Sequence, residues 1–94
     1  MSTYVMYGKY SMDAIKTMSA GRTDKGRDLV KKFGGEVKSM YALLGEKDLL
    51  FIAAFPDAQN AMKASVALSK LTGISFTTTE AIPVEQFDKI MTEV

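Results

Sequence analysis

The chain has 94 residues, and its twelve basic and eleven acidic side chains leave a formal net charge of +1. This length predicts a single domain over residues 1–94, and the balanced charge gives no electrostatic reason to expect a nucleic-acid partner. The sequence contains neither cysteine nor histidine. Their absence excludes disulfides, thiolate metal sites and nucleophiles of the Ser–His or Cys–His type. We therefore expect no metal site and no cofactor.

No apolar run approaches the roughly 18 residues that a membrane-spanning helix needs. The first four residues lack the basic start and long apolar region of a signal peptide. From these two observations we expect a cytoplasmic protein without a membrane partner.

The first strand is predicted over residues 3–10, whose aromatic and branched side chains suit a pleated surface. Ser11 is a good helix N-cap and should begin a short helix. Residues 19–27 mix glycines with charges and interrupt the helical spacing, so we expect an irregular insert between the short helix and a second one. A second helix should follow from about residue 23 and end at the glycine pair 34–35.

Two strands joined by a tight turn are predicted next. The first covers residues 37–44, the turn is Gly45-Glu46-Lys47-Asp48, and the second strand covers residues 49–55. The second strand is apolar at every position, which is typical of a central strand covered on both faces.

The last third of the chain predicts a helix, a strand and a short terminal helix. Asp57 should cap a helix over residues 58–71, which carries an apolar stripe rich in small residues. A threonine-rich strand is expected over residues 74–82. Pro83 suits the first turn of the terminal helix.

The predicted order is strand, helix, strand, strand, helix, strand. This order is typical of the α+β, ferredoxin-like βαββαβ fold, in which two helices cover one face of a four-stranded antiparallel sheet. The other face should be apolar, because both alternating sets of the strand 49–55 are apolar. An apolar open face indicates a partner. We expect a homodimer or larger homo-oligomer of the dimeric α/β-barrel type. The alternative is a monomer whose terminal helix folds across that face with Phe87, Ile90 and Met91.

The segment from Gly34 to Asp48 and the opening Tyr4-Val-Met-Tyr-Gly-Lys-Tyr-Ser resemble the GYD-domain family of small bacterial and archaeal proteins. The motif that names the family reads Gly, then Glu or any residue, then Tyr and Asp, and here it is Gly45-Glu46-Lys47-Asp48. Lys47 stands where the family has tyrosine, so a role of that ring does not carry over. The resemblance covers nearly the whole chain and implies a ferredoxin-like, dimeric-barrel fold. It implies no established activity and no catalytic residues.

Five side chains are candidates for a ligand-binding site. Asp48 either accepts backbone N–H bonds in its turn or lies at a cavity mouth, where it could pair with Lys9 or Arg22. Lys9 either reaches water from its strand or lines a cavity as an anion-binding group or base. Tyr7 and Tyr41 either pack on the sheet or hold an aromatic or carbonyl-bearing ligand.

Arg22 lies in the stretch from Gly21 to Arg27, which superficially suggests phosphate binding but matches no Walker or dinucleotide pattern. A solvated loop is the simpler interpretation, and such a loop could also fold over a barrel mouth.

These residues predict a small oligomeric binding or interaction module that uses the open sheet face, with a small hydrophobic or anionic ligand. The alternative is a cofactor-free dimeric-barrel enzyme, a monooxygenase or isomerase acting on a small hydrophobic substrate. A cavity that holds Tyr7, Lys9 and Asp48 together would favour the enzyme. A purely structural subunit is the third possibility. Whether the chain is an enzyme is left open by the sequence.

Overall fold

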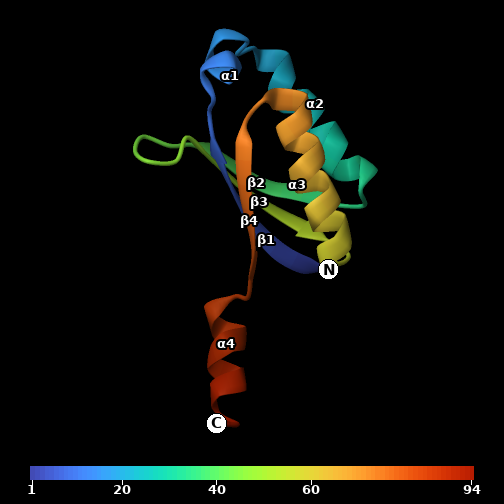
Figure 1. Cartoon of the computed structure of the whole chain (residues 1–94). Coiled ribbons are helices and arrows are strands. Elements are labelled where there is room, and N and C mark those ends of the chain that lie inside the picture. The colour runs from blue at the N-terminus through green and yellow to red at the C-terminus, as the bar shows by residue number, and fades with distance from the viewer.

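A four-stranded antiparallel sheet forms the frame of the computed structural model, which describes residues 1–94 (Figure 1). Its strands are β1 (Ser2–Lys9), β2 (Glu36–Ala42), β3 (Leu49–Phe55) and β4 (Ser75–Ala81). They lie in the order β2-β3-β1-β4, which places β3 in the middle of the sheet as predicted, beside β1. The ferredoxin-like α+β fold is thereby confirmed.

The helices α2 (Ala20–Lys32) and α3 (Ala58–Thr72) cover one face of the sheet, whereas the other face carries no helix (Figure 1). The short helix α1 (Met12–Lys16) follows β1, and α4 (Val84–Met91) extends beyond the end of β4. None of these helices combines the length and apolar character that crossing a bilayer requires.

The irregular insert is shorter than predicted, because α2 begins at Ala20 rather than at about residue 23 and runs through both of its glycines. Gly26 is buried, and a Cβ atom at this position would lie 3.6 Å from a methyl group of Leu68 on α3. This is an ordinary contact distance, and it shows that α2 packs against α3 at this point. This packing, together with the burial of Val30, outweighs the low helix propensity of the segment.

Alternation along the strands divides apolar side chains between the two faces. On the helix-covered face, Tyr4 and Met6 of β1 form one buried cluster with Phe51 and Phe55 of β3 and Leu68 of α3. Ala61 and Ala64 of α3 belong to the same cluster. Their small side chains let α3 lie close to the sheet, as the small-residue stripe predicted.

The opposite face is uncovered in the single chain. Ile52 is only half-buried there, so the expectation that β3 is covered on both faces is not met by one chain alone. The terminal helix does not fold across this face either, because α4 projects away from the sheet and contains no buried residue (Figure 1). The alternative of a monomer sealed by its own terminal helix is therefore wrong.

Candidate functional site

The turn that follows β2 is fastened to the end of β1 by three hydrogen bonds. The backbone N–H of Asp48 donates to the carbonyl of Gly8 at 2.9 Å. The Asp48 carboxylate accepts from the backbone N–H of Tyr10 at 2.8 Å, and the ammonium of Lys9 donates to the carbonyl of Glu46 at 2.9 Å. A carboxylate that accepts a backbone N–H makes a charge-assisted bond, which is among the stronger kinds in proteins.

Asp48 therefore has the structural role that turn chemistry predicted, with the difference that its donor belongs to another segment. The hypothesis that Asp48 pairs with Lys9 or Arg22 is wrong, because the chain's one ion pair within 4.0 Å joins Lys38 to Glu36. Lys9 is exposed, and its ammonium is held by the turn.

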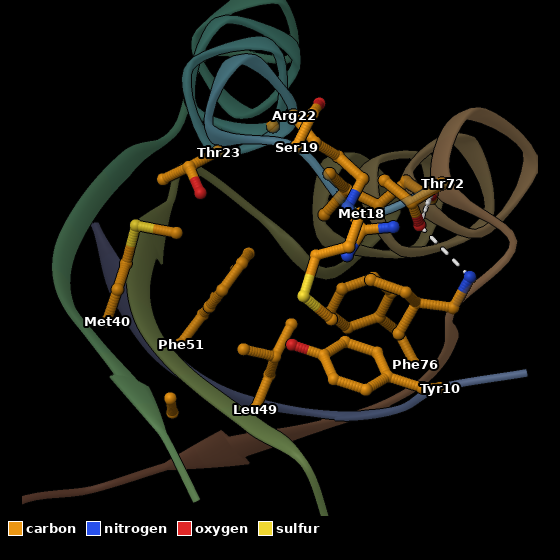
Figure 2. A pocket seen from close by; sticks show the side chains of 14 residues that line it. Tyr10, Met18, Ser19, Arg22, Thr23, Met40, Leu49, Phe51, Thr72 and Phe76 are labelled. Carbon is orange, nitrogen blue, oxygen red and sulfur yellow. Dashed lines mark hydrogen bonds between the residues drawn. The ribbon is translucent and has the colours of Figure 1, made fainter. Parts of the chain in front are cut away.

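A cavity of about 230 Å³ lies between α2 and the sheet, on the face that the helices cover (Figure 2). Most of its wall is apolar, and no acidic side chain contributes to it. Leu49, Met40 and Phe51 line the cavity from the central hairpin (Figure 2). Phe76 lines it from β4 and Tyr10 from the end of β1 (Figure 2). The hydroxyl of Thr72 is already engaged, since it donates to the carbonyl of Leu68 at 2.7 Å and accepts from the N–H of Ile74 at 3.1 Å.

Arg22 is the one charged side chain on the wall of this cavity. It stands in the first turn of α2, is partly buried, and donates from Nη1 to the carbonyl of Ala14 at 2.7 Å. Its guanidinium carbon lies 5.6 Å from the centre of the Tyr10 ring, a cation–π distance. A guanidinium carries five N–H donors, so these contacts orient Arg22 while leaving donors and a whole positive charge beside the cavity.

Sequence reasoning named Arg22 but missed the side chains that surround it, among them Tyr10 and Met18. The sequence contained a signal for both residues. Strand alternation places Tyr10 on the same face as Tyr4 and Met6, and helical spacing aligns Met18 with Ile15. The sequence pattern did not predict that α2 begins at Ala20, which places Arg22 beside the cavity.

The remaining predicted residues, Tyr7 and Tyr41, lie on the open face, away from Arg22. Both are opposite Leu50 in the strand register, so Tyr41, Leu50 and Tyr7 form one row across β2, β3 and β1. The neighbouring row contains Ile52 and Val5. Tyr41 is 55% exposed and Tyr7 37%. The structure therefore places the five predicted residues in three separate locations. Tyr7 and Tyr41 lie on the open face, Lys9 and Asp48 form hydrogen bonds at the turn after β2, and Arg22 lines the cavity.

Tyr4 of β1 is buried, and its hydroxyl has an altered pKa. Burial against the helices raises the pKa of its hydroxyl above the ordinary value of 10.0, and the charge of Glu80, its partner on β4, raises the pKa further. Tyr4 therefore stays protonated at neutral pH and cannot serve as a base.

Comparison with known proteins identifies a matching family profile and solved structures of similar fold. The GYD domain profile matches residues 4–91. A solved structure of the leucine response regulatory protein LrpA from Mycobacterium tuberculosis is similar, with a TM-score of 0.58, 11% identity, and coverage of 87% of this chain and 51% of that one. A second solved chain, a glutamate-to-alanine mutant, has a TM-score of 0.58 and 11% identity, covering 87% of this chain and 50% of its own length. The chain thus spans about half of these structures. No curated protein matches it in sequence.

Proposed function

This chain belongs to the GYD domain family, and from that premise we propose that it is a small-molecule-binding module whose ligand has a compact apolar body and an anionic end. The ligand occupies the cavity between α2 and the sheet. The observation that carries this proposal is Arg22, a partly buried guanidinium with no carboxylate within 4.0 Å on the wall of an apolar cavity.

The charge of Arg22 and the size of the cavity together limit the class of ligand that fits. A partly desolvated cation gains most from a partner that neutralises it, and a guanidinium matches a planar carboxylate. A cavity of about 230 Å³ is below the roughly 300–1,000 Å³ of sites for drug-sized ligands. These properties favour a branched or aromatic carboxylate of a few carbons. A zwitterionic amino acid fits less well, because no acidic side chain lines the cavity to receive its ammonium group.

The binding role is preferred over the enzymatic alternative for a geometric reason. A cavity that holds Tyr7, Lys9 and Asp48 together would favour the enzyme. Tyr7 lies on the open face, whereas Lys9 and Asp48 are held by the turn that follows β2.

Isothermal titration with two matched probes tests the proposal. The probes are 4-methylpentanoate and leucine, which differ in the α-ammonium group; leucine is included because the similar LrpA structure is named for its leucine response. We expect 4-methylpentanoate to bind more tightly. Losing a charge-assisted hydrogen bond costs about 1.5–3 kcal/mol, so Arg22→Gln should weaken its binding roughly 10- to 150-fold.

The matched control is Arg27→Gln, which removes the same charge from an exposed position of the same helix. Its affinity should equal that of the unmodified protein. Equal weakening by the two variants, or no binding of either probe at millimolar concentration, would contradict the proposed site.

A second function, self-association through the open face, is favoured by the row of Tyr41, Leu50 and Tyr7. An antiparallel sheet that exposes contiguous apolar side chains is typical of an interface. We propose that two chains pack these faces together as a homodimer, the arrangement of the α/β barrel. Light scattering after size exclusion tests this assembly, and the variants that separate it from folding are described in the Discussion.

A further inference from the structure

Helix α4 has an apolar edge that nothing in its own chain covers. Val84, Phe87, Ile90 and Met91 lie on one side of the helix, and each is more than 40% exposed. No residue of α4 is buried. An eight-residue helix is too short to be stable in water by itself, so its apolar edge needs a surface to pack against.

The connection to β4 keeps that surface from being the helix's own sheet. Pro83 has φ −55° and ψ 142°, an extended conformation, and a residue before proline, here Ile82, is also restricted to extended geometry. The chain therefore continues straight from β4 into α4 (Figure 1). The molecule is 50 Å long and 30 Å wide, with a radius of gyration of 14.3 Å, compared with about 12 Å for a compact domain of this length.

The segments before and after the start of α4 carry net charges of opposite sign. Residues 1–83 carry eleven basic and eight acidic side chains, a net charge of +3. Residues 84–94 carry Lys89 against Glu85, Asp88 and Glu93, a net charge of −2. The projecting helix is thus complementary in charge to the body of another copy, which favours and steers their association.

One groove on the body combines the properties that α4 needs. It runs between the end of α2 and the exposed side of α3, and it is lined by Phe33, Met62, Lys63, Val66, Ala67 and Lys70. Met62 is 68% exposed and Val66 58%. The groove is shallow and open, with two cations and no acidic side chain on its wall. It lies on the helix-covered side of the molecule, away from the open face.

We propose that α4 of one chain docks into this groove of a second copy. Phe87, Ile90 and Met91 pack against Met62 and Val66, while Glu85 and Asp88 lie near Lys63 and Lys70. Reciprocal exchange of the two helices closes the assembly as a dimer. The contact is independent of the ligand cavity and of packing between open faces.

Disulfide trapping tests the contact, because the chain has no cysteine of its own. Ile90→Cys protein is mixed with Val66→Cys protein, oxidised mildly, and analysed by mass spectrometry for the mixed pair. A disulfide needs Cα atoms about 4.4–6.8 Å apart, so only close docking gives a high yield. The control partner is Asp13→Cys, at an exposed position of α1.

We expect at least tenfold more mixed product with Val66→Cys than with Asp13→Cys, and a decrease in strong salt. Lys63→Glu with Lys70→Glu in the Val66→Cys chain should lower the yield to the control level. Adding Glu85→Lys and Asp88→Lys to the Ile90→Cys chain should restore it. Equal yields from the two partners, or a yield unaffected by charge reversal, would overturn the proposal. The Ile52→Lys background keeps this readout separate from the open-face dimer.

Discussion

The carboxylate of Asp48 accepts a hydrogen bond of 2.8 Å from the backbone N–H of Tyr10, a residue 38 positions earlier in the chain. The bond joins the turn of the central hairpin to the point where β1 ends. Because Tyr10 also lies under the guanidinium of Arg22, the same bond helps to fix one wall of the cavity.

Asp48→Ala should destabilise the fold by about 1–3 kcal/mol, since it leaves a partly buried N–H without its charged acceptor. Asp48→Asn keeps a carbonyl acceptor and should therefore destabilise the fold less than Asp48→Ala does. Urea denaturation followed by circular dichroism measures both. Glu46→Ala is the control, because that residue contributes its backbone carbonyl to Lys9 and no side-chain bond. A loss from Glu46→Ala equal to that from Asp48→Ala would contradict the special role of the carboxylate.

Alkaline pH should weaken the fold through Tyr4. Its pKa is raised in the folded chain above the ordinary value of 10.0, so folding favours the protonated hydroxyl. The contribution of Tyr4 to the free energy of unfolding is fully present below pH 10. It is lost as the pH rises through the pKa that Tyr4 has in the folded chain. Tyr4→Phe cannot ionise and should show a smaller loss of melting temperature between pH 9 and pH 11 than the unmodified protein. Parallel curves for the two proteins would show that Tyr4 does not control this range.

The sequence predicted the sheet well because the strand-forming residue types, the continuous apolar run of β3 and the helix caps are local features. Ser11 accepts the N–H of Ala14 and Asp57 accepts the N–H of Asn60, as their residue types indicated. The start of α2 at Ala20 was not predictable in this way. It depends on the packing of α2 against α3, two segments far apart in the chain whose contact no local pattern encodes. The same gap hid the cavity, because Arg22 reaches it only from a helix.

Two adjacent residues of β3 separate folding from assembly. Ala53 faces the helices and is fully buried, whereas Ile52 faces the open side and is half-buried. Ala53→Lys should prevent folding, because an unpaired charge would enter the core. If open faces pair, Ile52→Lys should leave the circular dichroism spectrum native and lower the mass measured by light scattering, so that only the dimer formed by exchange of α4 is left. An Ile52→Lys assembly with the same mass as the unmodified protein would contradict pairing through this face.

Gly35 lies between α2 and β2, beside the ring of Phe55. A Cβ atom added here would lie 2.5 Å from the ring of Phe55 and 2.9 Å from the carbonyl of Ala54. Phe55 is fully buried and cannot move without disturbing the core. Gly35→Ala should therefore lower the free energy of unfolding, measured by urea denaturation, by at least the roughly 1–3 kcal/mol that overpacking usually costs.

Gly21 provides the opposite case within the same chain. It lies in the first turn of α2, and a Cβ atom added there would meet nothing within 4 Å. Gly21→Ala should stabilise the fold by about 0.5–1 kcal/mol, because alanine loses less backbone entropy in a helix. If both substitutions destabilised the protein equally, the close approach of Gly35 to Phe55 would not be the cause. Opposite signs in one host would attribute the loss to that contact.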